Sequence, residues 1–235
     1  MLPNVTYSTA QRGGCGDAKH DAQPISSVHA GSRRQRRARG PVGPIMTWRP
    51  RSGGTRFFFP DLDEVTRDWI LAEWEEEERV APFRGAQLTT RGRSAFGTAM
   101  RSAIASGDEQ SLFVDLASSD YWQSSGIRPD RYGRPQFYTI NPEASARQLA
   151  ITEFNTAYVH GLTRRLLEED VAEVAVYRAA PAFVLRGECL EHEGSQYPTL
   201  LIYEGHRARY HPVPRPGALS VPVGPNCHHS VRRPG

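Results

Sequence analysis

Apolar residues recur every three to four positions from about residue 57 to residue 170, and this spacing predicts a series of amphipathic helices. Beyond residue 170 the pattern changes to short runs that alternate between apolar and polar residues, which is typical of strands. The expected strands are Val171–Tyr177, Phe183–Leu185 and Thr199–Tyr203, with an earlier short strand at Gln136–Ile140. We therefore expect an α+β fold, with a helical N-terminal part followed by a small β-rich, proline-rich tail.

Polar residues that cap helices mark where the predicted helices begin. Asp61, followed by Glu64 in a capping-box pattern, is expected to open the first helix, and Thr89 or Thr90 the second. Asp108 is expected to cap a third helix. The longest helix is expected to begin at Asn141, because the next residue, Pro142, suits the first helical position, and to continue to about residue 170.

Two groups of polar residues lie within these helices. The first predicted helix carries an apolar stripe along one face. Near its end it has four consecutive acids, Glu75–Glu78. We expect these acids to form a solvated face rather than to act as catalytic carboxylates. The stripe consists of Leu62, Val65, Trp69, Ala72 and Val80. In the longest helix, Glu153, Asn155 and His160 either line a site or, as we expect, are solvent-exposed or locally hydrogen-bonded.

The composition divides the chain into three parts. Residues 1–45 are rich in Gly, Ser, Arg and Pro and are expected to be a disordered basic leader, because they contain too little apolar surface to offset the entropy of ordering. The basic run Ser32–Gly40 is either an arm that lies on nucleic acid or a solvated tail. Met46 opens a segment that resembles a natural start. A helical region is expected over 46–140, and the long helix with a Cys/His-bearing β-rich domain over 141–235.

Charge and hydropathy narrow the functional class only a little. The formal net charge is +3, and Lys19 is the only lysine, so almost all positive charge comes from arginine. Arginine binds phosphate oxygens well, but a GC-rich coding genome explains the same bias. The chain has neither an apolar run long enough for a membrane span nor a signal-peptide pattern at its start. We therefore expect a location in the cytoplasm, or in a particle assembled there, and no membrane partner.

Cysteine and histidine residues gather in the last fifth of the chain. Cys189 and His192 form a C-x-x-H pair, and Cys227 with His228 or His229 forms a second short pair. Thiolate and imidazole are the ligands that zinc prefers, so the sequence predicts a tetrahedral zinc site with ligands Cys189, His192, Cys227 and His229. Two other interpretations stay open: buried thiols beside ordinary polar histidines, or a disulfide between the two cysteines, which is disfavoured in a reducing compartment.

The order of these motifs resembles the C-terminal domain of the minor head, or head morphogenesis, proteins of tailed bacteriophages (the Mu type). The matching residues are Thr152, Glu153 and Asn155 in the long helix; Cys189, Gly194 and Pro198 in the following turn; and Pro225, Asn226 and Cys227 near the end. The resemblance covers about residues 143–232. It implies a structural protein that joins the portal and capsid proteins during virion assembly and touches packaged DNA, rather than an enzyme.

The chain departs from the family pattern at three positions. Arg186 stands where the family has the first cysteine of its C-x-x-C turn, and Gly224 replaces the histidine of the terminal H-P-N-C-x-C motif. His229 stands where that motif has its last cysteine. His192 is a candidate substitute for the missing ligand.

Two further functions compete with this one. The first is a metal-dependent nuclease of the ββα (HNH-like) type, in which His211 would be the general base, with Asn226 and His228 in the helix of the motif. The second is a zinc-stapled interaction module without chemistry. In this module a patch of arginines and aromatic residues would contact a partner or nucleic acid, and its basic residues are Arg207, Arg209, Arg232 and Arg233.

Overall fold

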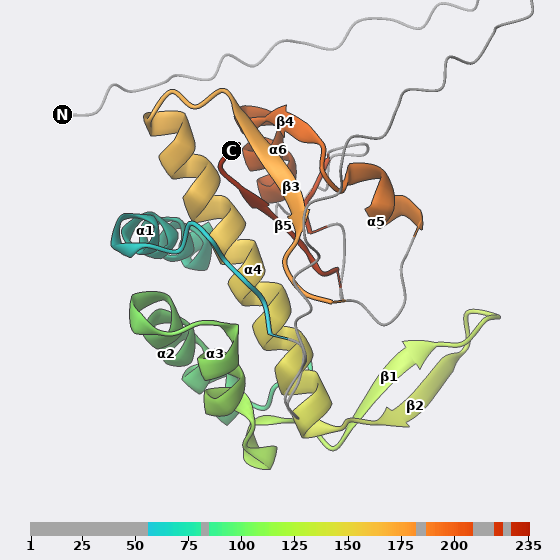
Figure 1. Cartoon of the computed structure of the whole chain (residues 1–235). Helices are drawn as coiled ribbons and strands as arrows, with labels where there is room; N and C mark the ends of the chain where they lie inside the picture. Colours follow the sequence, from blue (N-terminus) through green and yellow to red (C-terminus); the bar gives the residue numbers. More distant parts are fainter. Residues whose placement is uncertain (1–55, 81–84, 182–186, 209–218, 223–226) are drawn as a thin grey trace, which may run out of the picture. The chain divides into compact units, whose positions relative to one another are not determined.

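The computed structural model of the protein describes residues 56–80, 85–181, 187–208, 219–222 and 227–235, and these residues form helices and two small antiparallel sheets (Figure 1). The predicted α+β class is confirmed. The predicted leader and the predicted strand at 183–185 lie outside the described residues. In chain order the elements are α1 (Glu64–Val80), α2 (Thr90–Ser106), α3 (Glu109–Leu116), the 3-10 turn η1 (Ser119–Tyr121), β1 (Ser125–Pro129), β2 (Pro135–Thr139), α4 (Pro142–Glu168), β3 (Glu173–Arg178), α5 (Gly187–His192), β4 (Gln196–Pro198), α6 (Thr199–Ala208) and β5 (His229–Arg232).

Most helices begin where their capping residues predict. The side chains of Thr89, Asp108 and Asn141 accept hydrogen bonds from backbone N–H groups in the first turns of α2, α3 and α4. The first helix differs from its prediction, because the carboxylate of Asp63 rather than Asp61 accepts the N–H of Thr66, at 2.8 Å. α1 therefore begins two residues later than expected.

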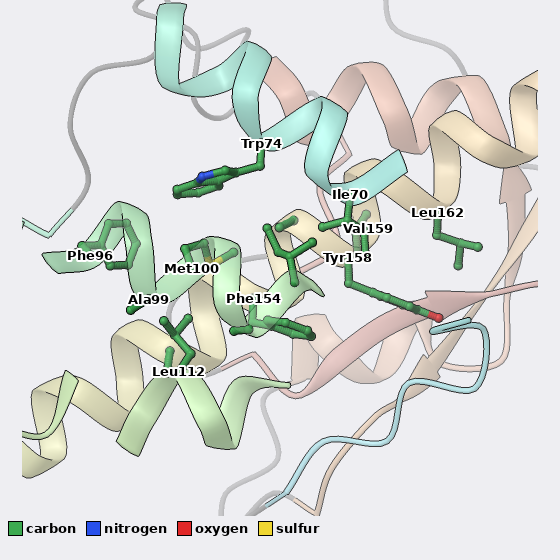
Figure 2. Packing of buried hydrophobic residues seen from close by; sticks show 14 of the residues in the cluster. Ile70, Trp74, Phe96, Ala99, Met100, Leu112, Phe154, Tyr158, Val159 and Leu162 are labelled. Carbon is green, nitrogen blue, oxygen red and sulfur yellow. The ribbon is translucent and has the colours of Figure 1, made fainter. Parts of the chain in front are cut away.

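The long helix α4 is the element on which the core is built. It packs against α1, α3 and α6, and its buried hydrophobic residues belong to a single large hydrophobic cluster (Figure 2). The cluster includes Ile70 and Trp74 of α1, Met100 of α2 and Leu112 of α3, together with Phe154 and Tyr158 of α4. Because α4 carries both the core contacts of the helices and those of the tail, it fixes the position of the Cys/His-bearing segment.

The buried face of α1 differs from the predicted stripe. Val65 and Ala72 are exposed, whereas Thr66, Ile70 and Trp74 are buried. The reason is that α1 meets α4 at Gly161, whose missing side chain lets Ile70 approach the α4 backbone. This contact rotates α1 away from the face that its apolar residues alone would select, and it also buries two of its glutamates.

The second sheet has the order β4-β3-β5, with both neighbours antiparallel to the central strand β3. Val174 and Val176 of β3 and Val231 of β5 are buried, so one face of this sheet joins the main core. The predicted strand at Val171–Tyr177 is thus confirmed as β3, which starts two residues later and ends one residue later than predicted.

One prediction for the region around the sheets is wrong, and one strand was not predicted. Thr199–Tyr203 is not a strand but the start of α6, whose buried residues Thr199, Ile202 and Tyr203 follow helical spacing. A short apolar run has no period of its own to distinguish the two structures, and packing against α4 selects the helix. No strand was predicted before residue 136 either, but β1 lies there and pairs with β2 from Ser125↔Thr139 to Pro129↔Pro135. Gly133, at φ +78°, permits the tight connection between them.

Among the helices of the described residues, none is both long enough and apolar enough to cross a membrane.

Candidate metal site

Two segments form the candidate site, β5 and the turn after α5, and both are held by β3. β5 pairs with β3 so that His229 lies opposite Arg178. On the other side of β3, the turn after α5 is fixed by Gly194, whose N–H donates to the carbonyl of Val176 at 2.9 Å. Gly194 has φ +81°, a conformation that favours glycine. The turn brings Glu193 beside β5.

Cys227, His229 and Glu193 form a continuous chain of contacts. The Cys227 Sγ atom lies 3.8 Å from Nδ1 of His229, and the Nε2 atom of the same ring lies 3.2 Å from Oε2 of Glu193. Glu193 also accepts a hydrogen bond from Nη2 of Arg178 at 2.5 Å. Cys227 and His229 are both buried. The two predicted ligands from the terminal motif are therefore adjacent and face each other.

The separation of the thiol and the imidazole suits a shared zinc ion. With Zn–S and Zn–N bonds of about 2.3 and 2.1 Å, two ligands of a tetrahedral zinc lie about 3.6 Å apart. The observed 3.8 Å between Cys227 Sγ and His229 Nδ1 differs from that value by only a few tenths of an ångström. A ligating histidine usually donates its other ring N–H to a carboxylate, and Glu193 occupies that position. This half of the predicted site thus fits a metal.

The other predicted pair, Cys189 and His192, lies on the short helix α5. Cys189 is within the helix, but its side chain is not among those that the structure describes. The Nδ1 atom of His192 is 2.7 Å from the hydroxyl of Tyr197, so only Nε2 of that ring is available to a metal. Within the described residues, no group of three or more His, Cys, Asp or Glu side chains is arranged to hold a metal ion. The side chains of His192, Cys227 and His229 are all described, so the structure does not bring these three predicted ligands together, and the side chain of Cys189 lies outside the described residues.

The electrostatics of the pair follow from these contacts. The hydrogen bond to Cys227 and the contact with Glu193 raise the pKa of His229 above its ordinary value, although burial opposes them. Burial raises the pKa of Glu193, but Arg178 and His229 outweigh it, so the pKa is lowered. Glu193 therefore remains ionised beside the imidazole, which is the state required to orient a ligating ring.

Asn155 connects the motif in α4 with the motif at the end of the chain. This side chain is 1% exposed, and its Nδ2 atom donates to the carbonyl oxygen of His229 at 2.9 Å. Glu153 and His160 are buried as well, so of the two alternatives expected for these polar residues, solvent exposure is wrong. Glu153 borders a cleft of about 270 Å³, together with Thr152 and Trp122 among other residues.

His160 forms a contact that the sequence analysis did not anticipate. Its Nδ1 atom pairs with the carboxylate of Glu77 from α1, and both side chains are buried. The expectation of a fully solvated acidic face at Glu75–Glu78 is therefore wrong for Glu77. The only signal in the sequence was an acid and a histidine in separate helices, and nothing in their spacing indicates that they meet.

The residues of the alternative nuclease are only partly described. His211 and Asn226 lie outside the described residues. The His228 ring packs edge-on against the Phe57 ring, with centroids 5.8 Å apart, and burial lowers its pKa. The backbone carbonyl of His228 accepts the N–H of Ala179 at 2.8 Å. These contacts attach the start of β5 to the segment before α1 and to the end of β3.

The predicted arginine patch is described only at its C-terminal end. Arg232 is exposed and lies over the Tyr177 ring, 5.7 Å from its centroid. Arg233 forms an ion pair with Glu169, so part of its charge is neutralised within the molecule. The side chain of Arg207 in α6 is not among those described, and Arg209 lies outside the described residues.

Glu193 is the residue of the site that the sequence analysis missed. It follows His192 directly in the sequence, and no role was predicted for it. Its role depends on the pairing of β5 with β3, which no local pattern specifies. Comparisons with family models, with curated proteins and with solved structures find no match to this chain.

Proposed function

We propose that this chain is a structural protein of the minor head, or head morphogenesis, type of tailed bacteriophages, with a zinc ion that staples its C-terminal part. In this role it acts during head assembly in the cytoplasm and remains in the virion. Its expected partners are the portal and capsid proteins, and no catalytic step is assigned to it.

The observation that carries the proposal is the hydrogen bond from Asn155 to the carbonyl of His229. The resemblance rests on three short motifs that are far apart in the sequence, and short motifs often match by chance. A chance match gives no reason for the three motifs to lie in contact in the folded chain. Here the helix motif touches the terminal motif directly, and the turn motif meets it through Glu193. Three separate sequence signals thus belong to one structural unit.

The individual motif residues also have structural roles that explain their presence. Gly194 occupies a positive-φ position, and Pro198 ends β4 immediately before α6 begins. Cys227 and His229 have the separation that two ligands of one zinc require. A structural zinc ion contributes its binding free energy to folding, so one here would stabilise the tail. These features support the proposal that the tail is a metal-stabilised docking unit.

Incorporation into phage particles tests this function. Source cells that produce particles are lysed, capsids are separated on a density gradient, and the fractions are analysed by mass spectrometry for peptides of this chain. The proposal predicts that the chain sediments with capsid and portal proteins, in far fewer copies than the major capsid protein. A chain that remains at the top of the gradient while capsids sediment would contradict the proposal and leave the zinc-stapled interaction module.

A further inference from the structure

The β1–β2 hairpin is a two-stranded ribbon with almost no cover from the rest of the described chain. Its strands pair only with each other, and every residue in them is exposed or half-buried (Figure 1). At its base, Nε2 of Gln87 donates to the Tyr138 hydroxyl at 2.8 Å, and the N–H of Ile140 donates to the carbonyl of Ser124. An isolated two-stranded hairpin is only marginally stable in water. Because the apolar side chains of this hairpin are exposed to solvent, they bury little surface and add little to the stability of the fold.

Large apolar side chains nevertheless lie on one face of the ribbon. Ile127 and Phe137 are directly opposite each other in the strand register, and they are 61% and 73% exposed. Tyr132, in the connection between the strands, is 65% exposed. Exposed rings of this kind offer flat surfaces on which another ring system can stack.

Three arginines of the hairpin lie over the rings of two tyrosines, Tyr132 and Tyr138. The Arg128 guanidinium is 5.2 Å from the centroid of Tyr138, while those of Arg131 and Arg134 are 4.6 and 5.1 Å from the centroid of Tyr132. The rings hold the guanidinium groups in place without neutralising them. Cations that are ordered in this way lose less entropy when they bind an anion.

The single acid of the hairpin is used within the turn. Asp130 accepts hydrogen bonds from the backbone N–H groups of Tyr132 and Arg134, at 2.8 and 2.9 Å, and from Nε of Arg134. The hairpin therefore carries a net charge of +2 from three arginines and one aspartate. An anionic partner is favoured by this charge.

The edges of the ribbon argue against a partner strand. Pro129 and Pro135 face each other at the end near the turn. Proline has no N–H to donate, and proline and charged residues at an edge discourage pairing with another strand. Recognition is thus directed to the faces and the turn. Phe137 lies on one face, Arg128 lies over Tyr138 on the opposite face, and Arg131 lies in the turn that joins the strands. A nucleic acid strand that passes over the tip of this narrow ribbon meets both arginine and an exposed aromatic ring, a combination that suits phosphates and bases.

We propose that the β1–β2 hairpin is an arm that binds nucleic acid, with Arg128 and Arg131 on phosphates and Phe137 stacking on an unpaired base. This inference rests on the hairpin alone and does not depend on the proposed role in head assembly. It differs from the arginine patch at the end of the chain, where Arg233 is already paired with Glu169.

The test is fluorescence anisotropy of the full chain with a labelled single-stranded oligonucleotide of about 20 nucleotides, and with a duplex of the same length. The double variant Arg128→Gln/Arg131→Gln is compared with Arg79→Gln/Arg91→Gln, which removes equal charge from exposed arginines outside the hairpin. Arg134 is left unchanged because it helps to order the turn through Asp130. The full chain also contains the basic run at 32–40, so differences between variants decide the outcome.

We expect the hairpin double variant to bind the single strand roughly tenfold more weakly at about 0.1 M salt, with a log–log salt slope reduced by about 1.4. The control should stay within about threefold of the parent. Phe137→Ala should weaken single-strand binding about fivefold or more and duplex binding less, because stacking requires an unpaired base.

Three results would overturn the proposal. One is the absence of binding to either oligonucleotide. Another is a hairpin variant that binds no more weakly than its charge-matched control. The last concerns the Arg128→Gln/Arg131→Gln and Phe137→Ala variants together. If both bind nucleic acid as the parent does but differ from it in self-association, measured by sedimentation, the hairpin is a protein-docking surface.

Discussion

The contact between α1 and α4 at Gly161 yields the sharpest stability prediction. A Cβ atom added at Gly161 would lie 2.4 to 2.5 Å from Cγ1, Cα and N of Ile70. Two of these three atoms belong to the backbone of α1, so no side-chain rotation can relieve the overlap. The substitution Gly161→Ala therefore requires the two helices to move apart.

The magnitude follows from two opposing contributions. Alanine is favoured over glycine within a helix by about 1 kcal/mol. Forcing extra atoms into a packed interface costs about 1–3 kcal/mol and sometimes more, and here the whole helix contact must shift by about 1 Å to reach ordinary van der Waals distance. Because the overlap is with backbone atoms inside the main core, where Tyr158 and Leu162 are fully buried, we expect the upper end of that cost, about 3 kcal/mol. After the gain of about 1 kcal/mol is subtracted, Gly161→Ala should lower the free energy of unfolding by about 2 kcal/mol.

Gly97→Ala is the matched control. A Cβ atom there would meet only the ends of the Glu78 and Arg101 side chains, at 2.9 and 3.4 Å, and both can move. We expect Gly97→Ala to be neutral or to stabilise the protein by up to about 1 kcal/mol. Urea unfolding followed by tryptophan fluorescence measures both variants. Equal or greater stability of Gly161→Ala relative to the parent would refute the close helix contact.

Three further predictions concern single side chains. Asn155→Leu removes the donor to the carbonyl of His229 and should lower the free energy of unfolding by about 1–3 kcal/mol, and unchanged urea unfolding would contradict this. Burial raises the pKa of Glu109 to about 7, so its stabilising contribution is complete below pH 4.5 and is lost as the pH rises through 7. Glu109→Gln should therefore gain up to about 3 kcal/mol relative to the parent at pH 8 and much less at pH 5, whereas a difference independent of pH would argue against a buried acid. Arg165→Met should lower the free energy of unfolding by about 1 kcal/mol at pH 7, since Arg165 contacts Asp63 at 2.5 Å. This loss should shrink toward pH 2, because the contact with Arg165 lowers the pKa of Asp63 to about 2. An equal loss at both pH values in urea unfolding would contradict this.

The sequence predicted those features that depend on neighbouring residues. The caps at Thr89, Asp108 and Asn141 are examples, because a capping side chain and its N–H partner lie within three residues. The length of α4 and the strand β3 followed from their own periodicity. These features require no knowledge of the rest of the chain.

The features that the sequence did not predict depend on contacts between distant segments. The face that α1 buries is set by Gly161, some ninety positions from its partner Ile70. The helix α6 was mistaken for a strand because its short apolar run fits both periods until packing against α4 selects one. Glu193 joins the candidate site only because β5 pairs with β3.

The central structural claim is that the α5 turn and the end of the chain meet at one zinc ion. The most direct test is the zinc content per chain, measured by native mass spectrometry on the parent protein and on Cys189→Ser, Cys227→Ser and Cys15→Ser. The last variant is the control, because Cys15 belongs to neither ligand pair. The account predicts one zinc per chain in the parent and in Cys15→Ser, and none in the other two. A parent protein purified without metal, or zinc retained equally in all variants, would contradict it.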